Sequence, residues 1–94
     1  MTPDDGPPAL VRLPGVLIAL FPEAKSRFET SARSVEALMN ELEERWPGMR
    51  DRLCDSTPAV RRHINVFVDG KRSALSAPIR PGANVFILTA ISGG

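Results

Sequence analysis

A single segment of this chain carries a long amphipathic helical pattern, and that pattern limits how the other segments can fold. Between residues 34 and 46, apolar residues recur three and four positions apart and therefore share one helix face: Val35, Leu38, Met39, Leu42 and Trp46. Ser34 precedes them as an N-cap, and Pro47-Gly48 ends the helix. Met49 to Leu53 is expected to add one further turn. A helix with one apolar face has to pack against another layer, which the flanking segments must supply.

Short apolar and β-branched runs before and after this helix predict the strands of that second layer. Strands are expected over residues 9–13, 24–30, 63–68, 71–74 and 84–89. Asp69-Gly70 signals a hairpin turn, residues 16–21 fit either a strand or a helical turn, and residues 76–82 form a loop anchored by Ile79. Two strands, a helix and three strands is the order of the ubiquitin-like β-grasp. We therefore expect an α+β fold, with a mixed sheet of four to five strands and one main helix packed across it.

Length and composition fit one small domain. A chain of 94 residues that is 43% hydrophobic can bury one core but not two. We expect residues 1–8 to be a disordered N-terminal lead-in, residues 9–89 to be the β-grasp domain and residues 90–94 to be a flexible C-terminal tail.

The net charge indicates which partners to expect, and the N-terminal sequence and the cysteine count indicate the compartment. The formal net charge is +1, which indicates neither a nucleic-acid partner nor a membrane surface. The acidic, Pro-rich start does not resemble a signal peptide, and a single cysteine, Cys54, fits a reducing compartment. A cytoplasmic location is therefore expected.

The last residues, Ile91-Ser92-Gly93-Gly94, carry the clearest functional signal. Glycine has no Cβ, so a diglycine end can enter a narrow active-site tunnel and adopt almost any φ and ψ. From Ala90 onward the chain can extend roughly 16 Å at about 3.3 Å per residue, which is enough to thread such a tunnel. The pattern suits a carrier whose reactive group is its own main-chain terminus; an artificial or disordered end is the alternative.

Three stretches resemble the MoaD/ThiS family of ubiquitin-like sulfur carriers, nearest the branch that contains the cysteine-biosynthesis sulfur carrier and the small modifiers. They are residues 34–53, 61–70 and 81–94, preceded by Val11-Arg12-Leu13-Pro14. The middle stretches mainly encode the fold, whereas the terminal motif is specific when it is joined to this fold. The chain departs from its relatives in two places, which bear on partner choice. Residues 80–84 lack the acidic residues that relatives often carry there, and residues 16–21 are more apolar than usual.

The resemblance implies that the chain is not itself an enzyme but a carrier or substrate protein, or the small subunit of a synthase complex. An E1-like adenylyltransferase would use ATP to adenylate the Gly94 carboxylate. A persulfide would then attack and leave a thiocarboxylate that donates sulfide. Gly93 would keep the tunnel approach slim, and Ser92 and Ile91 would complete the tail, with Ile91 as an apolar anchor.

The same resemblance implies the partners. They are the E1-like enzyme and a sulfur-accepting synthase. Cysteine biosynthesis is the first expectation for the pathway, and molybdopterin or thiamin synthesis is the second. No cofactor is expected to be bound, because the activating partner uses the ATP. Neither nucleic acid nor a membrane is an expected partner, and the free protein is expected to be a monomer.

Two other classes of function stay open. A ubiquitin-like protein modifier would form isopeptide bonds with target lysines, and a plain β-grasp binding module would leave the diglycine unused. An intrinsic enzyme is the least favoured class, because the sequence shows no acid, base and nucleophile set and no metal-ligand cluster.

Some side chains are candidates for docking. If the even-numbered residues of 64–68 face the helix, Phe67 faces away from it, and Phe86 and Leu88 do so likewise. Such an apolar outer face would suit docking to an activating enzyme or acceptor, unless loops cover it. Arg61 and Arg62, with Lys71-Arg72 across the hairpin, form either a basic docking patch or a solvated strand edge.

Two further side chains have a reactive and a structural interpretation. Cys54 is either a persulfide relay or a buried small residue, and the buried role is favoured. His63, the only histidine, has no partner at a recognisable spacing, so a structural or solvent-exposed role is favoured.

Overall fold

The computed structural model describes residues 6–54 and 64–89. Most of the lead-in, the whole tail from Ala90, and Arg61, Arg62 and His63 lie outside the described residues. At the start of the described chain, the Pro7 carbonyl accepts a hydrogen bond from the Gly82 N–H at 3.0 Å.

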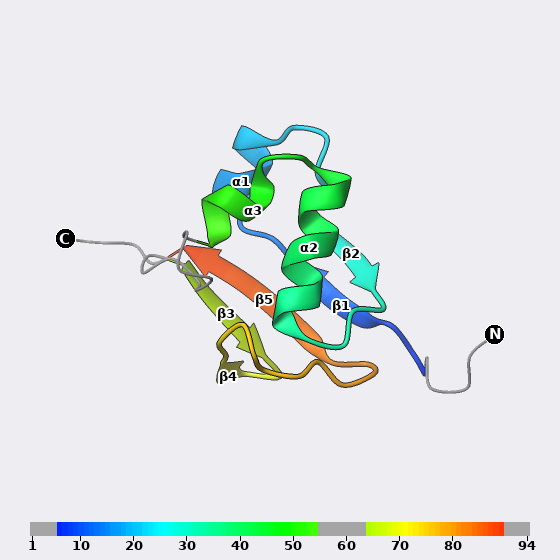
Figure 1. Cartoon of the computed structure of the whole chain (residues 1–94). Coiled ribbons are helices and arrows are strands. Elements are labelled where there is room, and N and C mark those ends of the chain that lie inside the picture. The colour runs from blue at the N-terminus through cyan, green and yellow to red at the C-terminus, as the bar shows by residue number, and fades with distance from the viewer. Residues whose placement is uncertain (1–5, 55–63, 90–94) are drawn as a thin grey trace.

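The structure is a mixed five-stranded sheet covered on one side by helices, as in the β-grasp fold that the sequence predicts (Figure 1). The strands are β1 (Ala9–Arg12), β2 (Arg27–Thr30), β3 (Ile64–Val68), β4 (Lys71–Arg72) and β5 (Asn84–Thr89). Their order across the sheet is β2-β1-β5-β3-β4. β5 is central, parallel to β1 and antiparallel to β3.

Three helices form the covering layer: α1 (Gly15–Leu20), α2 (Val35–Arg45) and α3 (Met49–Leu53). The predicted cap is confirmed, since the Ser34 side chain accepts a hydrogen bond from the Ala37 N–H at 3.0 Å. The predicted further turn is also confirmed, because α3 follows Gly48 and buries Met49 and Leu53.

The core lies between α2 and the inner face of the sheet. Its fully buried members alternate along the strands and recur along one side of α2: Val11, Val66, Val85, Ile87, Val35, Leu38, Met39 and Leu42. Ile79 is 1% exposed, and its N–H donates to the Arg33 carbonyl at 2.9 Å. Ile79 thus anchors the long loop before β5 in the core, as expected.

The structure settles the ambiguous segment at residues 16–21 as a helix. α1 begins after Pro14, whose carbonyl accepts the Leu17 N–H at 3.0 Å. The helix buries Leu17 against the core, whereas its neighbours Val16 and Leu20 are about half exposed.

Two predicted strands are shorter in the structure. Residues 24–26 belong to a turn in which the Ala24 N–H donates to the Phe21 carbonyl at 2.8 Å, so β2 begins only at Arg27. The return strand expected over residues 71–74 is reduced to the two residues of β4. In both places the length is set by pairing across the sheet, which local propensity does not report.

The predicted hairpin turn at Asp69-Gly70 is confirmed. Both residues have positive φ, 52° and 84°, as a type I′ turn requires. The Asp69 side chain also accepts a hydrogen bond from the Asn84 N–H at 2.9 Å, and the Asp69 N–H donates to the Asn84 carbonyl at 2.8 Å. These two bonds tie the turn to the start of β5.

Candidate docking surface and carrier terminus

The predicted loading site follows the central strand of the sheet. β5 ends at Thr89, which lies opposite Ile64 at the start of β3. The residues predicted to thread a partner tunnel, Ile91, Ser92, Gly93 and Gly94, lie outside the described residues. The structure therefore bears on the base from which the tail starts: β5 pairs with β1 over residues 84–86 and with β3 as far as Thr89.

The face of the sheet that points away from the helices carries the predicted apolar residues. Alternation along β3 buries Ile64 and Val66 on the helix side and leaves Phe67 on the outer side, directly opposite Phe86. Leu88 is 44% exposed, whereas both phenylalanines are half-buried. The outer face is thus neither fully open nor fully covered.

A transverse row of aromatic and basic side chains crosses this outer face through all five strands. Register pairs join its members in the order Arg27, Arg12, Phe86, Phe67 and Arg72. We call this set the arginine–phenylalanine row. Two phenylalanines at its centre are flanked by arginines, so the row combines an apolar middle with positively charged ends.

Arg12 explains why Phe86 is only half exposed. Its guanidinium carbon lies 5.0 Å from the centroid of the Phe86 ring, within the range of a cation–π contact. The Arg12 Nε atom is buried and has no hydrogen-bond partner among the described residues. Arg12 and Arg27 were not identified from the sequence. Arg12 meets Phe86 through the parallel pairing of β1 with β5, and Arg27 meets Arg12 through the antiparallel pairing of β2 with β1.

The predicted basic patch is described only in part. Lys71 and Arg72 are both exposed, but Arg61 and Arg62 lie outside the described residues. Arg72 pairs with Phe67 and so joins the outer face, whereas Lys71 pairs with Val68 on the helix side. The two β4 cations therefore belong to opposite faces of the sheet, although both line a hollow at the hairpin.

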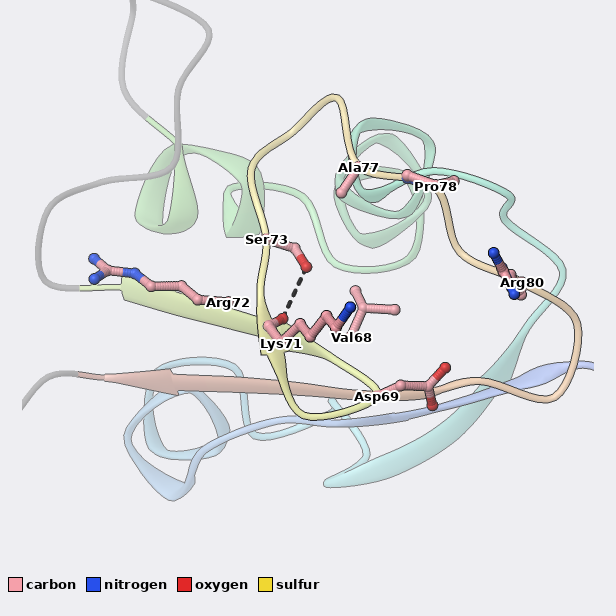
Figure 2. Close-up of a pocket in the computed structure, with 8 residues that line it drawn as sticks. All are labelled: Val68, Asp69, Lys71, Arg72, Ser73, Ala77, Pro78 and Arg80. Atoms are coloured by element: carbon pink, nitrogen blue, oxygen red, sulfur yellow. Dashed lines mark hydrogen bonds between the residues drawn. The ribbon is translucent and has the colours of Figure 1, made fainter.

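A hollow between the hairpin and the loop before β5 lies beside Lys71 (Figure 2). Lys71, Asp69 and Arg80 surround it, and the Ser73 hydroxyl donates to the Lys71 carbonyl at 2.9 Å. Figure 2 shows Arg72 pointing away from Lys71, so the basic groups do not converge on one point. The single proton of the Ser73 hydroxyl is therefore donated to a main-chain carbonyl and not to a basic side chain.

Cys54 is buried at the end of α3, where its N–H donates to the Arg50 carbonyl at 2.7 Å. A persulfide relay needs an accessible thiolate, so the buried position favours the structural role. His63 lies outside the described residues. Across residues 6–54 and 64–89, no group of three or more His, Cys, Asp and Glu side chains is placed to hold a metal ion.

None of the helices in the described part of the chain has the length and apolar character needed to span a membrane.

The β-grasp sheet with its helical layer defines a ubiquitin-like protein. The sequence model of the ThiS family matches residues 11–94, and the chain therefore belongs to the ThiS family. No curated protein sequence matches the chain.

Solved structures agree with this assignment. A chain from the crystal structure of the Amycolatopsis orientalis BexX/CysO complex is 26% identical, with a TM-score of 0.81 over 92% of this chain and 99% of that one. Mycobacterium tuberculosis CysO, described as an antigen, is also 26% identical, with a TM-score of 0.78 over 88% and 99%.

A more distant likeness concerns the fold alone. Small archaeal modifier protein 1 from Methanosarcina acetivorans is 16% identical, with a TM-score of 0.75 over 94% of this chain and 97% of that one. The family assignment and these comparisons together make the chain a ThiS-family protein with a ubiquitin-like fold.

Proposed function

We propose that this chain is a sulfur carrier and that the carboxylate of Gly94 is the group that is loaded. Membership of the ThiS family over residues 11–94 is the observation that carries this proposal. The position of β5 supports it, because this strand stays paired with β3 as far as Thr89 and so gives the following five residues an ordered base.

The chemistry follows from the poor reactivity of a carboxylate. An E1-like adenylyltransferase would join the Gly94 carboxylate to AMP and release pyrophosphate from ATP. A persulfide sulfur then attacks the carbonyl carbon and AMP leaves. A thiol reduces the resulting S–S bond, and a thiocarboxylate remains at Gly94. The chain contributes the reacting group and the docking surface, while the partners contribute the catalytic groups.

The tail and the outer sheet face have separate roles in this proposal. Gly93, Ser92 and Ile91 thread the tunnel of the partner, and the absence of a Cβ at Gly93 keeps that approach narrow. The outer face around Phe67, Phe86 and Leu88 docks against the activating enzyme. A partner surface with an apolar centre and acidic rim would complement the arginine–phenylalanine row.

The acceptor in this proposal is a sulfur-accepting synthase. We place cysteine biosynthesis first, with molybdopterin and thiamin synthesis as alternatives. Similarity to the BexX/CysO and CysO structures, at 26% identity each, supports this order.

Intact mass spectrometry tests the loading step. The purified chain is incubated with a cognate E1-like enzyme, ATP and a persulfide donor. The expected product has one oxygen replaced by sulfur, and fragmentation places that exchange at Gly94. A chain lacking Gly93 and Gly94 is the control and should keep its original mass.

The same experiment separates the competing functions. Adenylation followed only by reductant-resistant Lys–Gly conjugates would show a protein modifier instead of a carrier. Unchanged function after deletion of Gly93 and Gly94 would show a plain binding module.

Docking is tested with a matched pair of substitutions. Leu88 on the outer face and Leu20 on α1 are 44% and 48% exposed, so a change to Glu perturbs a similar surface leucine in each case. Leu88→Glu should weaken binding to the E1-like enzyme by about tenfold or more, because it places a charge in the apolar centre. Leu20→Glu should leave that affinity unchanged; equal effects of the two changes would contradict the assigned face.

A further inference from the structure

Helix α1 exposes more apolar surface than a helix of a free monomer needs to expose. Its sequence, GVLIAL, has no charged or polar side chain, and Leu17 is its one buried residue. Val16 and Leu20 are 50% and 48% exposed. Ala19 lies on the exposed side with them, so the three form an apolar ridge. Exposed apolar surface of this kind marks an interaction site.

A groove of about 290 Å³ lies next to this ridge. It runs between the end of α1 and the end of α2, and its apolar walls come from Leu20, Phe21, Pro22, Trp46 and Pro47. Two opposite charges, Glu23 and Arg45, complete its lining. We call the ridge and the groove together the α1–Trp46 patch.

The groove is held in shape by contacts beneath it. Arg45 pairs with Glu41 at 2.8 Å, and Glu41 accepts a hydrogen bond from the Thr30 hydroxyl on β2. The Arg45 guanidinium carbon lies 4.8 Å from the Phe28 ring centroid, and Phe28 meets Trp46 edge-on at 5.5 Å. A wall fixed in this way loses little side-chain entropy on binding.

We propose that the α1–Trp46 patch binds a second copy of this chain about a two-fold axis. An isologous contact requires one patch to carry both a projection and a matching hollow, and here the ridge lies directly beside the groove. Leu20 of each copy enters the groove of the other. Glu23 and Arg45 supply one negative and one positive charge to the groove, and Arg45 also pairs with Glu41 of its own chain. With the axis between the two grooves, each Glu23 lies against the other copy's Arg45 and joins that ion pair.

Charge complementarity favours this face over the outer sheet face for self-association. The arginine–phenylalanine row carries three arginines, Arg12, Arg27 and Arg72, and two such rows would repel each other. Because the helices lie on the opposite side of the sheet, the dimer leaves the outer face open for another partner (Figure 1). This proposal differs from the monomer expected from the sequence.

The size of the patch predicts a weak dimer. A contact made by one short helix and one groove belongs at the small end of specific interfaces, which bury about 600 Å² per copy. We therefore expect self-association in the micromolar range or weaker.

Sedimentation equilibrium over a concentration series tests the proposal on the full chain. The wild type should show a reversible monomer–dimer equilibrium. Leu20→Glu should weaken it by about tenfold or more, whereas Leu88→Glu, a leucine of similar exposure on the other side of the sheet, should leave it unchanged. A monomer at every concentration, or a dimer lost with Leu88→Glu and kept with Leu20→Glu, would overturn the proposal.

A charge swap tests the two-fold geometry. Glu23→Arg alone and Arg45→Glu alone place like charges across the axis and should each weaken the dimer. An equimolar mixture of the two variants restores both opposite-charge contacts and should associate more tightly than either variant alone. No gain on mixing would overturn the two-fold arrangement. The Leu20 and Leu88 comparison does not depend on Arg45, whose substitution also removes its contact with Phe28.

Discussion

Gly70 holds the second of two positive φ angles in the turn between β3 and β4. A Cβ added there would meet no heavy atom within 4 Å, so the obstacle to a side chain is the backbone conformation itself, φ 84°. We expect Gly70→Ala to lower the free energy of unfolding by about 1 kcal/mol, because an L-residue is strained in this region. Urea denaturation followed by Trp46 fluorescence measures the change.

Gly15→Ala is the matched control for this prediction. Gly15 also has open space around its Cβ position, but its φ is outside the left-handed region and it begins α1. Alanine there should leave the stability unchanged or raise it slightly. A loss equal to that of Gly70→Ala would contradict the explanation from backbone strain.

The side chain of Glu43, on α2, forms hydrogen bonds with the backbone at the start of α3. Its carboxylate accepts hydrogen bonds from the N–H groups of Gly48 and Arg50, both at 3.1 Å. Glu43→Ala should lower the free energy of unfolding by about 1–2 kcal/mol, because two partly buried donors lose their acceptor. Glu44→Ala removes the same charge from an exposed neighbour and should change stability by less than about 0.5 kcal/mol. Guanidinium denaturation measures the free energy of unfolding of both variants. Equal losses of stability would contradict the bridging role of the Glu43 carboxylate.

Among the elements, those with strong local signals were predictable from the sequence. α2 was predictable because its apolar period, the Ser34 cap and Pro47-Gly48 lie within the segment itself. The type I′ turn was predictable from Asp69-Gly70 for the same reason. The lengths of β2 and β4 were not, because they depend on pairing with strands distant in the sequence.

The candidate docking face was predictable only in its apolar part. Alternation along β3 and β5 places Phe67, Phe86 and Leu88 on one face without any knowledge of the neighbouring strands. The arginines that complete the row required the register of β1 against both β2 and β5. The long-range order of strands therefore determines the charge of this surface.

Helix α1 is uniformly apolar, yet Leu17 is its one buried residue and Ile18 is only partly buried against the core. Leu17 is 2% exposed, whereas Val16 next to it is half exposed. Leu17→Ala should lower the free energy of unfolding by about 2–4 kcal/mol, because it leaves a cavity in the core. Val16→Ala should change it by less than about 1 kcal/mol. Thermal and urea unfolding test the contrast, and similar losses at both positions would mean that α1 packs differently.

At the scale of the whole molecule, charge is divided between the two sides of the sheet. The strand residues on the outer side include Arg12, Arg27 and Arg72 and one acidic residue, Glu29, a net charge of +2. Helix α2 contains four Glu and one Arg, a net charge of −3. The overall net charge of +1 conceals this separation. A partner with an acidic surface is therefore steered toward the strands and away from α2.

Steering of this kind predicts that docking to an activating enzyme weakens as salt is added. Arg72→Glu, at the end of the arginine–phenylalanine row, should raise the dissociation constant by about tenfold at low salt, because it places a negative charge against an acidic rim. Arg52→Glu alters the net charge equally but lies exposed on α3, on the helical side of the sheet, and should have much less effect. Calorimetric titrations at several ionic strengths measure the dissociation constants of both variants for the activating enzyme. Since ions screen exposed charges, the difference between the variants should shrink as the salt concentration rises. Equal weakening by both substitutions would mean that only the net charge matters and would remove the case for the outer face as the docking surface.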